Sequence, residues 1–128
     1  MMLLLDTCTF LWALSGVPPL PPRVADLVSD PDNQVFLSAA SAWEIAVKYA
    51  AGRLTLPERP ERYVPAMRAE RGIAALAIDE ESALHASRLP SLHRDPFDRL
   101  LVSQAIVHGM TILTPDPIIS HYPARTFW

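Results

Sequence analysis

The sequence predicts an α/β fold in which a mainly parallel sheet is covered by helices on both faces. Short apolar segments alternate along the chain with longer segments in which apolar residues recur every three or four positions, the spacing typical of helices. Most of the short segments are continuously apolar, as in "MMLLL" and "MTILT". Strands of this kind are buried on both faces, which is the situation of a parallel sheet between helical layers.

Five segments are predicted to be strands because they are short and apolar. In chain order they are residues 1–6, 34–38, 74–78, 110–114 and 125–128. Parallel sheets place their functional sites just beyond the carboxyl ends of the strands, so the residues that follow these segments are of first interest.

Six segments are predicted to be helices from apolar periodicity and from residues typical of helix ends. Glycine closes several of them, and Asp79 and Asp95 are the expected caps of the last two. Ser41 and Glu44 have the S-x-x-E spacing of a capping box, and Glu44 also stands four residues before Lys48, a favourable ion-pair spacing. The predicted helices are residues 7–15, 21–30, 41–52, 60–71, 79–89 and 95–109.

Length and composition predict one soluble domain over residues 1–128. Half of the residues are hydrophobic and a fifth are charged, which excludes a disordered chain. The N-terminal apolar run is too short to span a membrane and lacks the charged start of a signal peptide, so no membrane partner is expected. Cys8 is the only cysteine, which rules out an internal disulfide and favours a reducing, cytoplasmic location.

The net charge of −3 disfavours a protein whose main task is to coat nucleic acid. The cationic side chains are ten arginines and one lysine, Lys48. Arginine grips phosphate through two hydrogen bonds, but it also makes ordinary surface ion pairs, and composition leaves both roles open.

Four acids are expected to lie at one edge of the sheet: Asp6, Glu44, Asp98 and Asp116. Three of them have ordinary structural explanations. Asp6 follows the first strand and can cap the next helix, Glu44 has its capping box and ion pair, and Asp116 in "TPDP" is a typical turn residue.

Asp98 is not explained in this way. On a helical wheel it lies inside the apolar stripe of helix 95–109, whereas Arg99 and Ser103 mark the polar face. A charge on an inward face is costly unless it is paired, hydrogen-bonded or bound to a metal. Asp95 is accounted for as the helix cap, so Asp98 is the acid that indicates a site.

Carboxylates gathered in this way need a cation. Two of them ~5 Å apart repel by roughly 3 kcal/mol at an effective dielectric constant of about 20. Hard oxygen ligands suit Mg²⁺ or Mn²⁺. Such an ion lowers the pKa of a bound water and stabilises a leaving oxygen, which is the chemistry of metal-assisted phosphodiester hydrolysis.

Other chemistries fit less well. The four histidines show no zinc-like spacing with Cys8, and no G-x-S-x-G, Walker A or G-x-G-x-x-G motif occurs. Cys8 is expected to be a small buried hydrophobe rather than a nucleophile. Phosphotransferases of the haloacid-dehalogenase and receiver types also place Asp after the first strand. The former needs D-x-D, where this chain has Cys8, and the latter needs a late lysine, which is absent.

Three stretches together resemble a PIN domain, specifically the VapC-type toxin of a type II toxin–antitoxin module: "LLLDTCTFLWAL", "SAWEIAVKYAAGRLTLP" and "RDPFDRLLVSQAIVHGMTILTPD". The resemblance covers nearly the whole chain and rests on the order of the acids rather than on one motif. It implies a three-layer α/β/α fold and a metal-dependent endoribonuclease that leaves 5′-phosphate and 3′-hydroxyl ends. It also implies a homodimer inhibited by a small antitoxin whose tail enters the active site.

The resemblance implies roles for particular residues. The catalytic and metal-binding set, for Mg²⁺ or Mn²⁺, would be Asp6, Glu44, Asp98 and Asp116. Outer contacts to the metal, water or substrate would be Asp95, Thr7, Thr114 and Arg99, the last holding phosphate or an antitoxin carboxylate, or else making a surface ion pair. RNA binding would need clustered arginines such as Arg94 and Arg99. The alternative is a PIN-fold binding or regulatory protein without catalysis, and an RNA cleavage assay separates the two.

Overall fold

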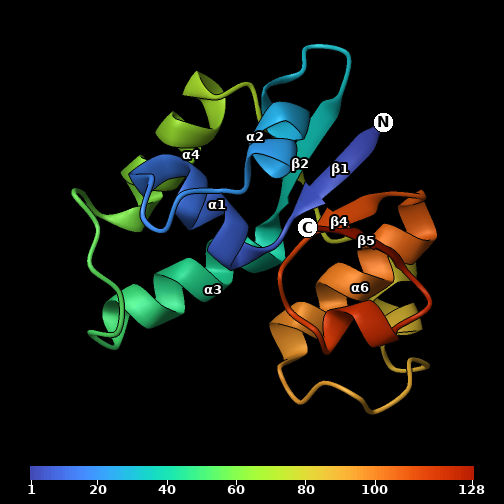
Figure 1. The fold of residues 1–128 in the computed structure, drawn as a ribbon. Coiled ribbons are helices and arrows are strands. Elements are labelled where there is room, and N and C mark those ends of the chain that lie inside the picture. The colour runs from blue at the N-terminus through green and yellow to red at the C-terminus, as the bar shows by residue number, and fades with distance from the viewer.

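The computed structural model describes residues 1–128 and is built around a five-stranded parallel sheet in the order β3-β2-β1-β4-β5 (Figure 1). Each strand lies within a segment predicted to be one, and the parallel arrangement is confirmed. The strands are β1 (Met2–Leu5), β2 (Gln34–Ser38), β3 (Ala74–Leu76), β4 (Thr111–Leu113) and β5 (Arg125–Phe127).

Six α-helices occupy the six predicted segments, with ends that differ by a few residues. Gly16 and Gly109 end the first and last of them in the left-handed conformation, as glycine at this position usually does. The helices are α1 (Thr7–Ser15), α2 (Pro22–Ser29), α3 (Ala39–Ala50), α4 (Pro60–Glu70), α5 (Glu80–Ala86) and α6 (Pro96–His108). A short 3₁₀ helix, η1 (Ile119–His121), was not predicted, because one turn is too short to show periodicity.

Helices cover both faces of the sheet, which makes the predicted three-layer α/β/α arrangement (Figure 1). Successive side chains of β1 point to opposite faces. Leu3 and Leu5 therefore join the core formed with α1, α2 and α4, whereas Leu4 joins the core formed with α6 and η1. All three leucines are fully buried, which is why this strand reads as a continuous apolar run.

The start of α3 differs from the prediction. The helix begins at Ala39 rather than at residue 41, and its cap is Ser38, whose Oγ accepts a hydrogen bond from the N–H of Ala40 at 3.0 Å. Ser41 lies inside the helix, and its buried hydroxyl has no hydrogen-bond partner. The capping box of Ser41 and Glu44 was therefore wrong, because the tight connection from β2 starts the helix one turn earlier.

Two alanine substitutions test this correction. Ser38→Ala removes both the cap and the hydrogen bond that Ser38 Oγ donates to Gln104 Oε1 in the interior. We expect the free energy of unfolding to fall by about 1–3 kcal/mol. Ser41→Ala removes an unpaired buried hydroxyl and is expected to leave stability unchanged or slightly higher. Urea unfolding of both variants measures the difference, and an equal loss for Ser41→Ala would restore the capping box.

The helical wheel predicted one buried side for helix α6, but a second side is buried as well. Ser103, expected on the polar face, is fully buried and donates a hydrogen bond to the carbonyl of Ser82 at the start of α5. This expectation was wrong because α5 packs against that side of α6. The expectation for Asp98 holds, since only 17 % of its side chain is exposed.

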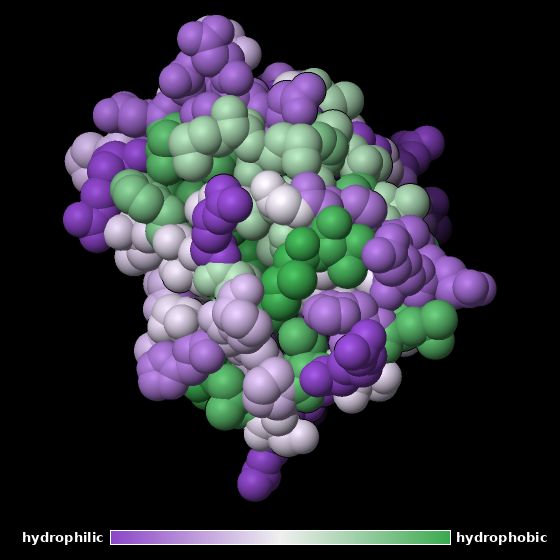
Figure 2. Space-filling model, turned by 90° about the vertical axis from the view of Figure 1, so that its right-hand side faces the viewer, coloured by the Kyte–Doolittle hydropathy of each residue, from purple (hydrophilic) through white to green (hydrophobic).

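No helix of the structure is long and apolar enough to cross a membrane. On the face in Figure 2, hydrophobic side chains lie in patches between many hydrophilic ones.

Candidate active site

The site lies at the carboxyl ends of β1 and β4, at the centre of the sheet. From β1 the chain runs first to β2 on one side, and β4 is later added on the other side, so the two central strands form a topological switch point. In open parallel sheets a crevice forms at this point. Asp6 directly follows β1, and Thr114 and Asp116 follow β4.

The four predicted acids are brought together in a cleft of about 190 Å³. Five carboxylates and a single ammonium group line it, which leaves four negative charges without a counter-ion when all are ionised. The lining residues are Asp6, Thr7, Cys8, Glu44, Lys48, Asp95, Asp98, Pro115 and Asp116.

Asp6 is both a helix cap and a cleft residue. Its Oδ1 accepts the N–H of Thr9 at 2.8 Å, which is the predicted cap of α1, and its Oδ2 accepts the hydroxyl of Thr114 at 2.5 Å. Burial raises the pKa of Asp6, against the lowering effect of these hydrogen bonds. The carboxylate is therefore held in one orientation between the two central strands.

Glu44 reaches the cleft from the second turn of α3. Its Oε1 accepts the hydroxyl of Thr7 at 2.6 Å, and its Oε2 pairs with Lys48 Nζ at 2.5 Å. This confirms the predicted ion pair, and the hydrogen bond to Glu44 raises the pKa of Lys48. Both oxygens of Glu44 thus have a donor within the protein.

Asp98 and Asp116 are joined by a residue that sequence reasoning missed, His93. Its Nε2 lies 3.1 Å from Asp98 Oδ2 and 3.0 Å from Asp116 Oδ2. Asp116 Oδ1 also accepts the N–H of Ile118 at 2.8 Å. His93 has no zinc-like spacing to the other histidines or to Cys8, but its place two residues before the cap Asp95 sets it beside the first turn of α6.

Asp98 has the weakest compensation of its charge. Burial first, and then the negative charge of Asp95, raises its pKa to about 7, although His93 acts in the opposite direction. Asp98 Oδ1 accepts no hydrogen bond from the protein, unlike both oxygens of Asp6, Glu44 and Asp116. A divalent cation is bound by several oxygen atoms from neighbouring carboxylates, one of which must be free to coordinate it. The potential ligand atoms of His93, Asp98 and Asp116 lie within 4.8 Å of one another.

Comparison with known proteins identifies the family of the chain. The family model described as PIN domain matches residues 3–124. The chain belongs to the PIN domain family. Over 95 residues this PIN domain is 37 % identical to ribonuclease VapC16 of Mycobacterium tuberculosis, a match that covers 66 % of this chain and 67 % of the relative.

Solved structures share the fold of this PIN domain at low sequence identity. One is a chain of VapBC2 from Rickettsia felis bound to a promoter DNA fragment, with a TM-score of 0.75, 16 % identity, and coverage of 99 % of this chain and 98 % of that one. Another belongs to VapBC-1 from nontypeable Haemophilus influenzae, with a TM-score of 0.64, 18 % identity, and coverage of 99 % and 97 %.

Arg99 lies outside the acidic cleft of the PIN domain. Its guanidinium donates hydrogen bonds to the carbonyls of Ala86 and Pro90, each at 2.9 Å, and to Tyr122 Oη at 3.3 Å. These bonds tie the segment after α5 to α6 and η1. The contacts give Arg99 a structural role and do not include an acid, so neither the surface ion pair nor a place beside the acids is observed.

Cys8 differs from its prediction, because it is exposed and lines the cleft instead of being a buried hydrophobe. It is the second residue of α1 and lies on the side of the helix that lines the cleft, whereas Phe10 in the same turn is buried in the core. Desolvation by its neighbours and the charge of Asp6 raise the pKa of the thiol, which keeps it protonated and a poor nucleophile.

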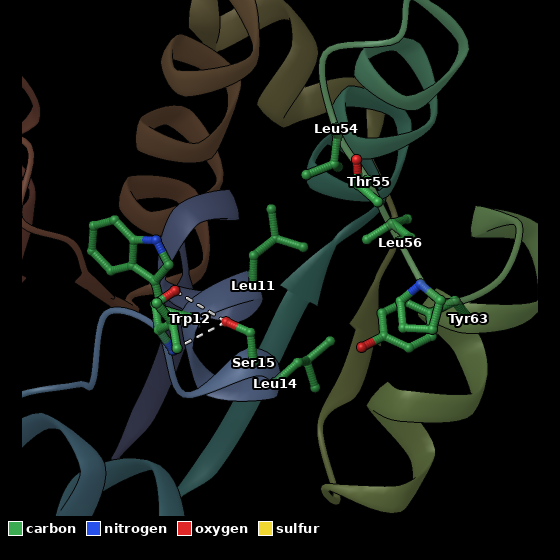
Figure 3. Close-up of a pocket in the computed structure, with 10 residues that line it drawn as sticks. Leu11, Trp12, Leu14, Ser15, Leu54, Thr55, Leu56 and Tyr63 are labelled. Carbon is green, nitrogen blue, oxygen red and sulfur yellow. Dashed lines mark hydrogen bonds between the residues drawn. The ribbon is translucent and has the colours of Figure 1, made fainter.

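A larger cavity of about 470 Å³ lies elsewhere, between α1, the segment 54–57 and α4 (Figure 3). Leu11, Leu14 and Leu56 project toward it in the close-up, and seven of its ten lining residues are hydrophobic. It contains no acid, histidine or cysteine. The acidic side chains that could bind a metal ion therefore line the smaller cleft of this PIN domain, not this cavity.

Proposed function

We propose that this PIN domain is a metal-dependent endoribonuclease and the toxin of a VapC-type toxin–antitoxin pair. The observation that carries the proposal is the cleft at the switch point, where five carboxylates meet one lysine. Similarity to ribonuclease VapC16 supports RNA as the substrate. The sequence alone favours the same chemistry, because Asp98 has no other explanation.

Mg²⁺ or Mn²⁺ is the proposed cofactor, held by Asp98, Asp116 and Asp6. When bound, the ion supplies the positive charge that lowers the pKa of a water and stabilises the leaving oxygen of the phosphodiester. Asp98 Oδ1 accepts no hydrogen bond from the protein and is therefore available to the ion. Glu44, whose two oxygens are held by Thr7 and Lys48, is placed to accept a proton from the attacking water or to bind through water.

The remaining side chains of the cleft orient these acids. Thr114 and the N–H of Thr9 fix the two oxygens of Asp6, as Thr7 does for one oxygen of Glu44. Lys48 uses one of its three N–H donors on Glu44, and 44 % of its side chain is exposed. Its remaining donors can hold a non-bridging phosphate oxygen of the RNA, the role that the resemblance implied for Arg99.

The proposed partner is an antitoxin protein, as in the complexes named VapBC whose chains share this fold. A homodimer and a cytoplasmic location remain part of the proposal, supported by the resemblance and by the single cysteine. The partnership is tested by co-expressing this protein with the product of the adjacent gene and asking whether the two co-purify.

The activity is tested by cleavage of an RNA pool with mapped ends. We expect wild type to cut in Mg²⁺ or Mn²⁺, to leave 5′-phosphate ends, and to stop in EDTA. Asp116→Asn is expected to lose cleavage, whereas Asp32→Asn, a change at an exposed acid far from the cleft, retains it. Cleavage by Asp116→Asn at the wild-type rate would contradict the assignment, and a folded wild type that cuts nothing would favour the non-catalytic alternative.

A further inference from the structure

His93 makes hydrogen bonds with both nitrogens of its ring. Nδ1 accepts the backbone N–H of Asp95 at 3.1 Å, while Nε2 faces Asp98 Oδ2 and Asp116 Oδ2. A backbone amide is always a donor, so Nδ1 must present a lone pair. The neutral ring therefore carries its hydrogen on Nε2, which is hydrogen-bonded to Asp116 Oδ2 and lies 3.1 Å from Asp98 Oδ2.

This arrangement argues against His93 as a direct metal ligand. An imidazole binds a metal through a lone pair, and its other nitrogen then carries the hydrogen and donates it to an acceptor. In this protein the other nitrogen faces a donor, the N–H of Asp95. The ring is thus close enough to share an ion with Asp98 and Asp116, but it offers them an N–H group instead of a lone pair.

The position of His93 is fixed from outside the cleft. Its backbone N–H donates to Tyr122 Oη at 2.8 Å, and the same hydroxyl contacts Arg99. Tyr122 is buried, directly after η1. The ring is therefore anchored to α6 through Asp95 and to the region after β4 through Tyr122.

We propose that His93 is a positioning residue whose Nε2–H bridges Asp98 and Asp116 and holds them at the spacing that a divalent cation needs. Asp98 is fixed on a helix, whereas Asp116 lies in the loop between β4 and η1, so a shared donor sets the distance between two separate elements. Asp98 Oδ1 remains open for the cation. The inference rests on the proposed function, because it assigns these acids to the metal.

The state of the ring can be measured directly by two-bond ¹H–¹⁵N correlation NMR at pH 8, in metal-free and Mg²⁺-loaded protein. We expect a protonated Nε2 and an unprotonated Nδ1 in both samples. A hydrogen that moves to Nδ1 when Mg²⁺ is added would identify His93 as a ligand and overturn the proposal. A ring protonated on both nitrogens in the metal-free sample would overturn it as well.

Two variants test the positioning role by Mn²⁺ titration calorimetry. His93→Gln keeps an N–H donor at the reach of Nε2, and His93→Leu keeps the volume without a donor. We expect His93→Leu to weaken Mn²⁺ binding about 10- to 100-fold, and His93→Gln to stay near wild type. His121→Leu, at an exposed histidine outside the cleft, is the matched control.

The experiments distinguish failure of the proposed role of His93 from failure of the proposed nuclease function. Mn²⁺ binding by folded His93→Leu at or above the wild-type affinity would overturn the role of His93, with its melting temperature in EDTA as the check on folding. If wild type itself bound no metal, the proposed function would fail. The metal-free NMR sample would still report whether Nε2 bears the hydrogen.

Discussion

Asp98→Asn is expected to abolish metal-dependent RNA cleavage while leaving the metal-free protein at least as stable as wild type. The carboxylate of Asp98 is mostly buried and lies among acids, and burial raises its pKa to about 7. Removing its charge relieves repulsion, so at pH 8 the free energy of unfolding in EDTA should rise by roughly 1–3 kcal/mol. Loss of a metal ligand should reduce cleavage by more than about a hundredfold.

The measurement is thermal unfolding with and without Mn²⁺, together with the cleavage assay. Mn²⁺ should raise the melting temperature of wild type more than that of Asp98→Asn. Asp79→Asn is a useful contrast, because hydrogen bonds from His108 and Ser82 lower the pKa of Asp79. Its neutralisation should destabilise the protein without affecting metal binding. An equal metal response of wild type and Asp98→Asn would argue against the site.

Metal affinity is expected to rise about tenfold between about pH 6 and pH 8, because the cation binds the ionised form of Asp98. The pKa of this group is about 7 in the folded protein and close to 3.8 without the protein environment. Between these values the folded, metal-free state holds a proton that the unfolded state has lost. The stability of the metal-free protein should therefore fall as pH rises through this window.

Titration calorimetry with Mn²⁺ in buffers of different ionisation enthalpy measures the metal affinity and the proton released on metal binding. Urea unfolding in EDTA across the same pH range measures the change in stability. Wild type should release a proton at about pH 6 and almost none at pH 8. Asp98→Asn should release less at the lower pH. An affinity for Mn²⁺ that is equal at both pH values would contradict the assignment of the raised pKa to a metal ligand.

The sequence by itself determined the strands, the helices, the parallel sheet and the four acids of the cleft. These depend on local or periodic signals. A run such as "MLLL" is apolar at every position because both faces of β1 are covered, and Asp6 follows it because the chain turns into α1 at the end of that strand. Asp98 was identified for a similar reason, since the wheel of one helix shows that its charge faces inward.

Only the tertiary structure decided the contacts between elements distant in the sequence. The wheel of α6 could not show that α5 buries Ser103, and the spacing of Ser41 and Glu44 could not show that Ser38 caps α3 while bonding Gln104. His93 acquired its place in the same way, because its partner Asp116 lies 23 residues away. Hydrogen bonds of this kind depend on how the elements pack, and no local pattern of residues encodes them.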